Sequence, residues 1–573
     1  MYVETVPNRN SPPAILLREG RRVGKKVHKR TLANLSSWPT DKIERLRRVL
    51  KDEPLVHPDQ LFLVERSLPH GQVELLLEVV RKLKLPWLID PRPSPQRDRV
   101  LAMILQRLLH PASKLATTRL WHTTTLSEEL SLEDSDEDDL YEAMDWLLER
   151  QDRIEAKLAK RHLSEGDPVL YDVSSSYYEG ESCPLMQFGH NRDGRRDRPM
   201  VVYGVLADRM GRPLAVEAYA GNTGDPTTVG DQVEKVRGRF GLERVVLVGD
   251  RGLLTETQIN HLKRYPGVGW VSALRHGQIR RLVESEAVQL SLFDRRHLAE
   301  VRSPDYPGER LIVCHNPILA EHRRQKRDAL LEATEEALGG IARQVARRTR
   351  TPLLATEIAE KVGRVKNRYQ VAKHFRTEIA DGVFRYERRS DAILREAQLD
   401  GFYILRTSEG ADRLEAAEVV RRYKDLTRVE RAFRSLKTVD LEIRPIRHRV
   451  EGRVRAHLLL CLLAYYVHWH LRQALAPLLF DDEELEAERA RRDPVLAAQP
   501  SDSAKRKKSQ RLTEEGLPLH SLETLMAAMG TRARHRCRLP SEPDAPCIQR
   551  LTEPTPLQQR ALELVRMFPG KRT

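Results

Sequence analysis

Two aspartates occupy positions where a sheet commonly carries a functional site. Asp172 lies near the end of a predicted buried strand at 168–173 (PVLYDV), and Asp250 directly follows a second predicted strand at 244–249 (RVVLVG). Sites form where strand ends of an open sheet point the same way. Each aspartate taken alone also fits a structural role, as a loop residue or a helix N-cap.

A third acidic residue, Glu430, lies on a predicted helix at 413–437 and stands within its apolar stripe. The stripe consists of Leu426, Val429, Phe433 and Leu436. A buried ionised carboxylate costs free energy unless it is paired or bound to a cation. The alternative to a cation is a buried salt bridge to Arg431 or Arg434.

A set of carboxylates without Cys or His partners favours hard divalent cations, and Mg²⁺ or Mn²⁺ fit best. Two such ions can stabilise the attacking and the leaving oxygens of a phosphoryl transfer. Water or a DNA 3′-hydroxyl then attacks in line, so the protein needs no covalent nucleophile. The serines after Asp172 have no paired His/Asp motif, which disfavours a serine nucleophile.

The surrounding elements predict a mixed α/β sheet. Strands are predicted at 168–173, 200–207, 213–219, 244–249 and 268–274, with helices at 227–239 and 255–264. Their order is not the strict alternation of a parallel sheet. Between them, His190 and Asp193 are interpreted as hairpin residues, Asn222 as a turn residue and Asp225 as a helix cap.

Composition narrows the class of protein. The longest strongly apolar run among the 573 residues is at 456–467, shorter than the ~20 residues of a bilayer span. The N-terminus has no signal-peptide pattern. The five cysteines have no C-x-x-C spacing, so neither a disulfide framework nor a zinc module is indicated. We therefore expect a cytoplasmic protein without a membrane partner, and the net charge of +15 favours a polyanionic partner.

Three segments of the chain carry basic residues. Two of them could contact nucleic acid or have an ordinary structural role, and the third is interpreted only as a loop. The cluster at 20–30 (GRRVGKKVHKR) fits a solvated loop or a phosphate contact. Helices on either side of Ser113, carrying Lys114 and Arg119, could form a DNA-reading helix-turn-helix, although an ordinary helical corner fits better. The segment 505–511 (KRKKSQR) predicts a flexible loop.

In combination, these motifs resemble the bacterial insertion-sequence transposases of the DDE class, which have an RNase H-like core. The similarity is to the group with the signature Y-x2-R-x3-E-x6-K. Its four positions are here Tyr423, Leu426, Glu430 and Lys437, so a leucine replaces the arginine. The contexts VLYDVSSS, GNTGDPTT, VGDRG and VRAHLLLCLLAYY extend the resemblance over 170–467, and residues 1–60 resemble the N-terminus of the family.

The resemblance implies a role for each signature residue. The implied metal ligands, holding two Mg²⁺ or Mn²⁺ ions, are Asp172, Asp250 and Glu430. The implied contacts to DNA phosphate are Tyr423 and Lys437, with Arg428 or Arg431 replacing the missing arginine. The protein would cleave the terminal inverted repeats of its element and transfer the 3′ ends to target DNA. Its implied partners are double-stranded DNA, in the nucleoid, and a second copy of the chain.

We expect five parts in the chain. They are a largely helical, candidate DNA-binding region (1–165), two parts of the RNase H-like core (166–275 and 413–475), an α+β insertion (276–412) and a helical or flexible C-terminal region (476–573). The resemblance implies that the insertion grips transposon ends. Four aromatic residues in it could stack on a base, but each fits a core position better: Phe384, Tyr386, Phe402 and Tyr403.

Two other functions remain open. The first is a metal-dependent nuclease on the same core, which cuts DNA without joining it. The second is a DNA-binding protein derived from a transposase that has lost its activity.

Overall fold

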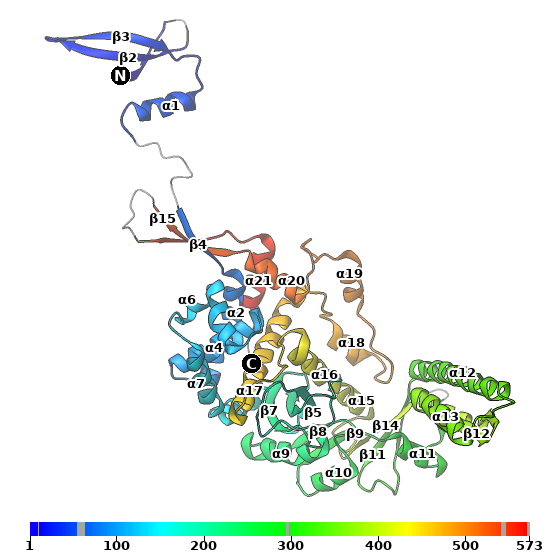
Figure 1. Ribbon diagram of the computed structural model, residues 1–573. Helices are drawn as coiled ribbons and strands as arrows, with labels where there is room; N and C mark the ends of the chain where they lie inside the picture. Colours follow the sequence, from blue (N-terminus) through cyan, green and yellow to red (C-terminus); the bar gives the residue numbers. More distant parts are fainter. Residues whose placement is uncertain (10, 54–62, 294–296, 540–545, 570–573) are drawn as a thin grey trace. The chain divides into compact units, whose positions relative to one another are not determined.

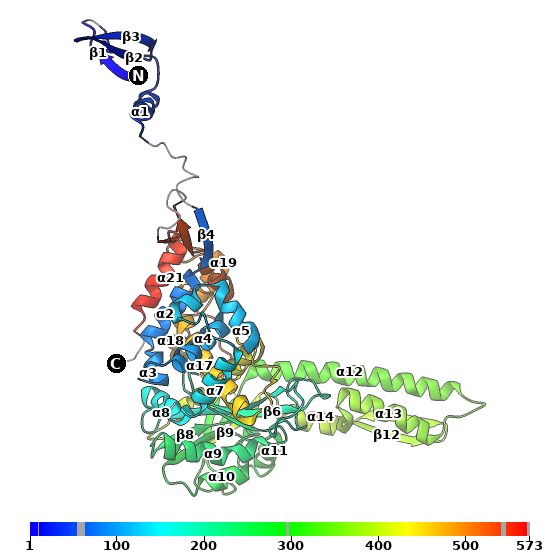
Figure 2. The ribbon, with the colours of Figure 1, turned by 60° about the vertical axis from the view of Figure 1, so that its left-hand side comes forward.

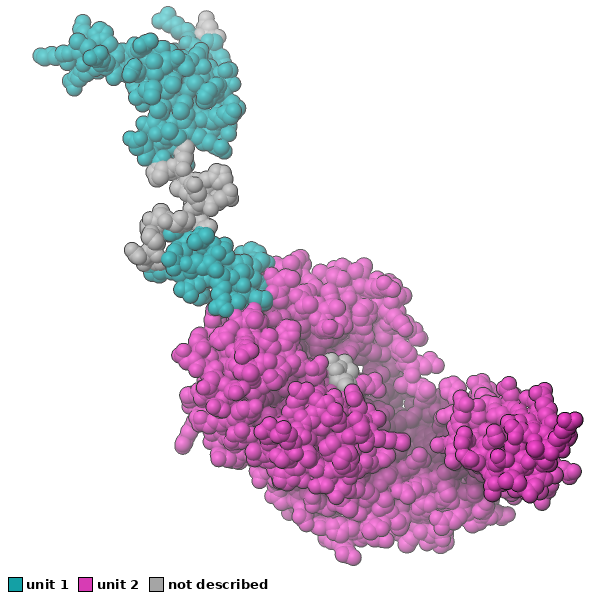
Figure 3. Space-filling model, in the orientation of Figure 1, with its two compact units in different colours: residues 1–69, 532–553 teal, residues 70–531, 554–573 magenta. Residues whose placement is uncertain are grey.

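The computed structural model describes residues 1–9, 11–53, 63–293, 297–539 and 546–569. The chain forms two compact units, of residues 1–69 with 532–553 and of residues 70–531 with 554–573 (Figure 3). None of the helices in the described ranges combines the length and the apolar character that a membrane span requires.

The first unit contains two small antiparallel sheets. Strands β1 (Tyr2–Val6), β2 (Ala14–Val23) and β3 (Lys26–Asn34) form one in that order, and helix α1 (Thr40–Val49) follows. The other sheet has β15 (Ala533–Arg538) in its centre, between β4 (Leu63–Pro69) and β16 (Ile548–Leu551).

The second unit is built on an eight-stranded sheet of order β10-β11-β14-β9-β8-β5-β6-β7 (Figure 1). Five of its strands are those predicted: β5 (Pro168–Tyr177), β6 (Met200–Asp208), β7 (Pro213–Ala220), β8 (Val245–Val248) and β9 (Val268–Ala273). The first three are antiparallel, whereas β8 is parallel to β5 and β9 is parallel to β8. This arrangement, 3-2-1-4-5 with the last two strands parallel to the first, is an RNase H-like core.

Three further strands come from the range expected to form an insertion. Strands β10 (Leu298–Val301), β11 (Arg310–His315) and β14 (Phe402–Thr407) extend the sheet beyond β9. The rest of the range forms an arm on which the long helix α12 runs outward (Figure 2). The arm comprises α12 (Pro317–Arg347), α13 (Ala355–Tyr369), β12 (Phe375–Ala380), β13 (Val383–Arg388) and α14 (Ser390–Ala397). It has an apolar core of its own, to which Phe384 belongs.

Helices cover both faces of the sheet. Tyr171 of β5 donates a hydrogen bond of 2.8 Å to Thr228, just before α9 (Val229–Glu234). On the other face, the ring of Tyr203 lies 5.8 Å from that of Phe433 on α16 (Leu426–Arg434). Side chains alternate between the faces of a strand. Asp172, the next residue after Tyr171, therefore lies on the face that α16 covers.

Several predicted helices differ in the structure. The predicted helix 413–437 is divided into α15 (Ala416–Lys424) and α16, followed by a π-helical turn at Ser435–Val439. The prediction of a loop at 505–511 is wrong, because α19 (Asp502–Gln510) occupies it. The Oγ of Ser501 accepts a hydrogen bond of 3.0 Å from the backbone N–H of Ala504 and caps this helix.

The remaining helices surround the sheet and the central helix α17 (Glu451–Leu475), which is buried over most of its length. They are α2 (Gly71–Lys82), α3 (Leu85–Ile89), α4 (Pro95–Leu109), α5 (Lys114–Leu120), α6 (Leu126–Leu130), α7 (Glu137–Leu148), α8 (Gln151–His162), α10 (Glu256–Leu262), α11 (His276–Glu284), α18 (Leu485–Arg491), α20 (Leu522–Gly530) and α21 (Pro556–Met567). Lys114, the first residue of α5, is only 5% exposed, so the packing favours an ordinary helical corner.

Candidate active site

The two aspartates follow a pair of facing residues on neighbouring parallel strands, Asp172 within β5 and Asp250 two residues beyond the end of β8. Leu170 of β5 pairs with Val248 of β8, and Asp172 and Asp250 each follow two residues later. Neighbouring strands are about 4.8 Å apart, and residues two apart point to the same face. The prediction that Asp172 ends its strand is wrong in one respect: β5 continues to Tyr177 along β6. Asp172 marks the point where pairing with β8 has ended.

Each aspartate carboxylate is oriented by backbone N–H groups. The Oδ1 of Asp172 accepts a hydrogen bond of 2.8 Å from the N–H of Val173. The Oδ1 of Asp250 accepts two, from Gly252 at 3.0 Å and Leu253 at 2.7 Å. All three of these bonds go to Oδ1. Among the described residues, no hydrogen bond goes to the Oδ2 atom of either aspartate, so both Oδ2 atoms have lone pairs for another ligand.

Helix α16 carries Glu430 over this strand pair. The prediction that Glu430 stands inside the buried stripe is wrong, because its side chain is exposed. The buried side chains of the helix and the following turn are Leu426, Val429, Ala432, Phe433 and Leu436. Each helical residue advances about 100°, so Glu430 lies at the edge of this stripe. Among the described residues it has no ion pair, which excludes the alternative of a salt bridge to Arg431 or Arg434.

The three carboxylates act on one another electrostatically. The pKa of Asp172 is raised from 3.8 to about 7; burial is the largest cause, and the negative charges of Asp250 and Glu430 contribute to the rise. The N–H of Val173 and the charge of Arg192 act in the opposite direction. Near pH 7 the carboxyl group of Asp172 is therefore about half protonated, and binding of a cation would favour its ionised form.

The three carboxylates have the chemistry of ligands for divalent cations, but they do not surround a single ion by themselves. Within the described residues, no three His, Cys, Asp or Glu side chains are close enough together to surround one metal ion. Mg²⁺ usually takes one or two carboxylates and completes its shell with water and substrate phosphates. The oxygen-only chemistry of the three side chains fits this requirement, and a cation would offset the charges of Asp250 and Glu430 that raise the pKa of Asp172.

Tyr423 on α15 lies beside the carboxylates. Burial raises its pKa to about 12, and the charges of Asp250 and Glu430 contribute to this rise. The phenol therefore keeps its proton at physiological pH and can donate a hydrogen bond to a phosphate oxygen.

Lys437, in the π-helical turn, is held by a buried aspartate that we interpreted as a hairpin residue. The Nζ of Lys437 lies 3.0 Å from Oδ1 of Asp193, which also pairs with Arg444. The side chain of Asp193 is 3% exposed, and its Oδ2 accepts a hydrogen bond of 3.2 Å from the N–H of Tyr177. Burial lowers the pKa of Lys437, and Asp193 acts against this change. No spacing in the sequence connects two residues so far apart.

Arg192, the neighbour of Asp193, brings a second cation toward the carboxylates. It pairs with Asp225, and its charge lowers the pKa of Asp172. The prediction that Asp225 caps a helix is wrong: Gly224 holds the N-cap position, and Asp225 makes no side-chain capping bond.

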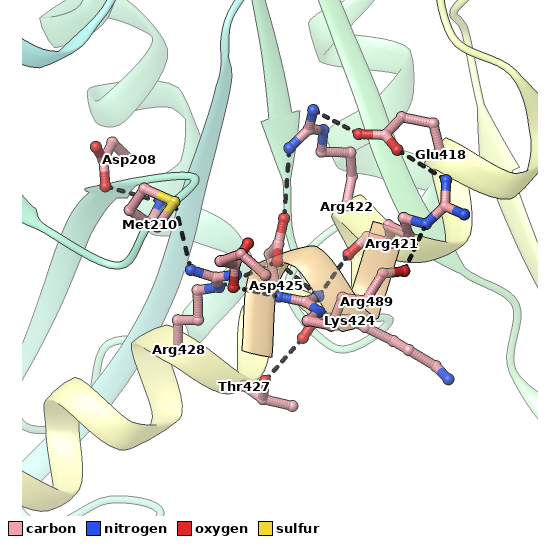
Figure 4. A network of polar contacts seen from close by, with 11 residues as sticks. Asp208, Met210, Glu418, Arg421, Arg422, Lys424, Asp425, Thr427, Arg428 and Arg489 are labelled. Atoms are coloured by element: carbon pink, nitrogen blue, oxygen red, sulfur yellow. Dashed lines mark hydrogen bonds and ion pairs between the residues drawn. The ribbon is translucent and has the colours of Figure 1, made fainter. Parts of the chain in front are cut away.

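The two arginines expected to replace the missing signature arginine differ in their surroundings. Arg428 points toward Met210 in the β6–β7 turn and forms ion pairs with Asp425 at 3.1 Å and with Glu486 (Figure 4). Its Nη1 lies 3.6 Å from the sulfur of Met210. Arg431 is exposed and has no ion pair among the described residues. Of the two, Arg431 has the freer side chain.

A basic cavity of about 720 Å³ opens beside the carboxylates, between the sheet and the arm. Arg251 and Tyr423 line it on the side of the sheet. The cationic residues of the arm that line it are Arg323, Lys326, Arg327, Arg368 and Lys373. Its two acids are already paired, Asp400 with Arg327 at 2.7 Å and Glu396 with Lys373. The cavity therefore has an excess of positive charge.

The chain matches two protein-family models. Residues 184–467 match the transposase DDE domain, a range that includes Asp250 and Glu430 and begins after Asp172. Residues 3–56 match the N-terminal domain of the IS1634 family transposases. No match was found among curated proteins. Among solved structures, the chain is similar to one in the cryo-EM structure of a piggyBac transposase synaptic complex with hairpin DNA, at 10% identity, 70% coverage of this chain, 75% coverage of that chain and a TM-score of 0.32.

The strand order and the acidic residues along it define a protein of the RNase H-like, DDE type. The two family matches together span more than half of the chain, and the chain belongs to the IS1634 family of DDE transposases.

Proposed function

We propose that the protein cleaves the terminal inverted repeats of its own insertion sequence and transfers the 3′ ends to target DNA. One observation supports the proposal: Asp172 on β5, Asp250 just beyond the end of the adjacent β8 and Glu430 on α16 are close enough that the last two raise the pKa of Asp172. Such a concentration of negative charge is favourable when it binds cations.

Asp172, Asp250 and Glu430 are the proposed ligands of two Mg²⁺ or Mn²⁺ ions. When bound, the ions supply a Lewis acid at each of the two oxygens that exchange at phosphorus. The role of the protein would be to hold these carboxylates in position before cations and phosphate bind. The backbone bonds to Asp172 and Asp250 support this role, because they hold one oxygen of each group in place.

The proposed path of the DNA follows the cations around the carboxylates. Tyr423 would donate its hydroxyl proton to a phosphate oxygen, and Lys437 and Arg431 would contact phosphates near the cleaved end. The basic cavity would hold DNA beside the site, in agreement with a gripping role for the arm. Arg428 is not among the proposed DNA contacts, because its charge is already neutralised by Asp425 and Glu486.

The decisive experiment compares three conservative variants, Asp172→Asn, Asp250→Asn and Glu430→Gln, in cleavage of end DNA and in joining of precut ends with Mg²⁺. Each should lose at least a thousandfold in both reactions and still bind DNA. The matched control is Asp197→Asn, which removes an exposed carboxylate from the loop between β5 and β6. Variants that process DNA like the wild type would contradict the proposal and favour a DNA-binding protein without activity.

A second outcome separates transposase from nuclease. Both enzymes would cleave, but only a transposase joins precut 3′ ends to a target duplex. Cleavage without any joining, over the full range of Mg²⁺ and Mn²⁺ concentrations, would favour the nuclease.

A further inference from the structure

The β2–β3 hairpin extends well beyond the strand that pairs with it. Strand β1 pairs only with residues 14–18 of β2. From there the two strands continue as a ribbon to a two-residue turn, at which Gly24 has a φ of +61°. Residues 19–32 are all exposed. A two-stranded ribbon is marginally stable alone in water, and this one buries no face, so packing does not account for its length.

The ribbon carries an unusual excess of cations. Residues 20–30 contain no acid and six lysines or arginines: Arg21, Arg22, Lys25, Lys26, Lys29 and Arg30. Lys29 pairs with Glu4 at 2.8 Å. The other five form no ion pair with any described residue. Like charges so close together repel one another, and an anionic partner would remove this cost.

The strand register distributes these cations over both faces. Arg21 lies opposite His28, and the pairs Val23–Lys26 and Glu19–Arg30 share its face. The opposite face carries Arg22 and Lys29. A flat acidic surface would meet only one of these faces. A membrane surface is also disfavoured, because the two valines near the turn, Val23 and Val27, point to opposite faces.

We propose that the β2–β3 ribbon enters the major groove of double-stranded DNA. This groove, about 12 Å wide and 8.5 Å deep, admits a two-stranded β-ribbon and has phosphates along both walls. Cations on both faces of the ribbon match those two walls. The inference rests on the proposed function only for the choice of DNA as the polyanion. It assigns the ribbon as the element of the N-terminal region that contacts the duplex.

The test uses the full chain and a mixed-sequence DNA duplex over a range of salt concentrations. The ribbon variant is Arg21→Ala/Lys26→Ala/Arg30→Ala, which removes three cations from one exposed face. Each lost phosphate contact lowers the slope of log K against log salt by about 0.9, so we expect a decrease of roughly 2.7. The ribbon variant should melt at the wild-type temperature, since all three side chains are exposed.

The matched control is Lys505→Ala/Arg506→Ala/Lys508→Ala on α19, which changes the net charge equally on another exposed basic segment. It should keep the wild-type slope. A wild-type slope in the ribbon variant, or an equal loss in the control, would overturn the inference.

The groove is tested with duplexes that are blocked on one side. Glucosylated 5-hydroxymethylcytosine fills the major groove, and netropsin fills the minor groove. On glucosylated DNA the wild type should bind no better than the ribbon variant, whereas netropsin should leave their difference intact. The opposite pattern would overturn the major-groove assignment.

The variant Asp172→Asn distinguishes a failure of the ribbon proposal from a failure of the proposed catalytic function. Wild-type binding by this variant, combined with a defect in the ribbon variant, supports the ribbon whatever the cleavage assay gives. Normal binding by the ribbon variant, in a chain whose cleavage depends on Asp172, overturns the ribbon alone.

Discussion

In the proposed site, a proton and a metal ion would compete for the carboxylate of Asp172. In the folded chain its pKa is about 7, and burial is the main cause; in the unfolded chain it returns to about 3.8. Between these values the folded state binds the extra proton, so stability must fall as pH rises through this window. Metal ions require the deprotonated group. Acid should therefore weaken metal binding at this site.

We expect Mg²⁺ to raise the melting temperature of the wild type clearly at pH 8 and hardly at all at pH 5.5. Asp172→Asn should abolish the Mg²⁺ effect and melt higher than the metal-free wild type at pH 8, because it carries no buried charge. Thermal melting at the two pH values checks this. An equal Mg²⁺ effect at both, or one that persists in the variant, would contradict the assignment of Asp172 as a ligand.

Asp193 is a positioning residue in the same region. Asp193→Asn keeps the shape of the side chain but leaves Lys437 and Arg444 without their anion, and removal of one partner of a buried pair costs about 3–5 kcal/mol. The pKa of Lys437 should fall further, since Asp193 is what holds it up. We expect a lower melting temperature and a cleavage activity whose decline on the alkaline side begins at lower pH.

The control for this prediction is again Asp197→Asn, on the same loop. Its side chain is 67% exposed and its pair with Arg198 is a surface contact, so neither stability nor the pH profile should move. An unchanged pH profile in Asp193→Asn would leave Asp193 with a purely structural role.

At the scale of elements, the arm and the sheet share the basic cavity. Lys326 of α12 and Arg368 of α13 line it and have no ion pair among the described residues. Lys326→Ala/Arg368→Ala should weaken binding of end DNA and lower the salt slope by about 2.

Two other arginines on the same helices provide a control. Arg324 and Arg364 pair with acids one turn away, Glu321 and Glu360, and lie outside the cavity lining. Arg324→Ala/Arg364→Ala removes equal charge and should leave the salt slope unchanged. Equal losses in both double variants would mean that the overall charge of the arm, and not the cavity, determines affinity.

The five core strands could be predicted because each is a short apolar run between turn residues, as in Met200–Asp208. The exposure of the Glu430 side chain could not be predicted in this way. Apolar spacing defines a stripe, but the width of the buried part depends on what packs against it, here Tyr203 beneath Phe433. The division between α15 and α16 was also missed, because apolar residues continue across Asp425. That residue is buried and pairs with Arg428 and with Arg489, which is distant in sequence.

The segment 276–412 illustrates a different limit. The sequence indicates its strands, but pairing partners are a property of the whole sheet. Strand β14 pairs with β11 and with β9, so its register depends on contacts with strands that lie far away in the sequence. Local pattern predicts a strand and does not predict its neighbour.

At the scale of the whole molecule, the proposed transfer reaction requires two transposon ends to meet. We propose that two copies of the chain assemble on them, and expect light scattering with end DNA to give a complex of two chains. The Asp172→Asn variant should assemble equally, because it keeps its DNA contacts. A complex that remains at one chain per end, at all protein concentrations, would contradict a homodimer as the working form.

The sheet formed by β4, β15 and β16 has a consequence for biosynthesis. Strand β4 is translated early, but it pairs only with β15, far toward the C-terminus. At 5–20 residues per second, β4 waits for roughly half a minute or longer before its partner leaves the ribosome. During that time an edge with exposed Leu63 and Val64 is open to other chains. Messages truncated before β15 should therefore yield aggregated product.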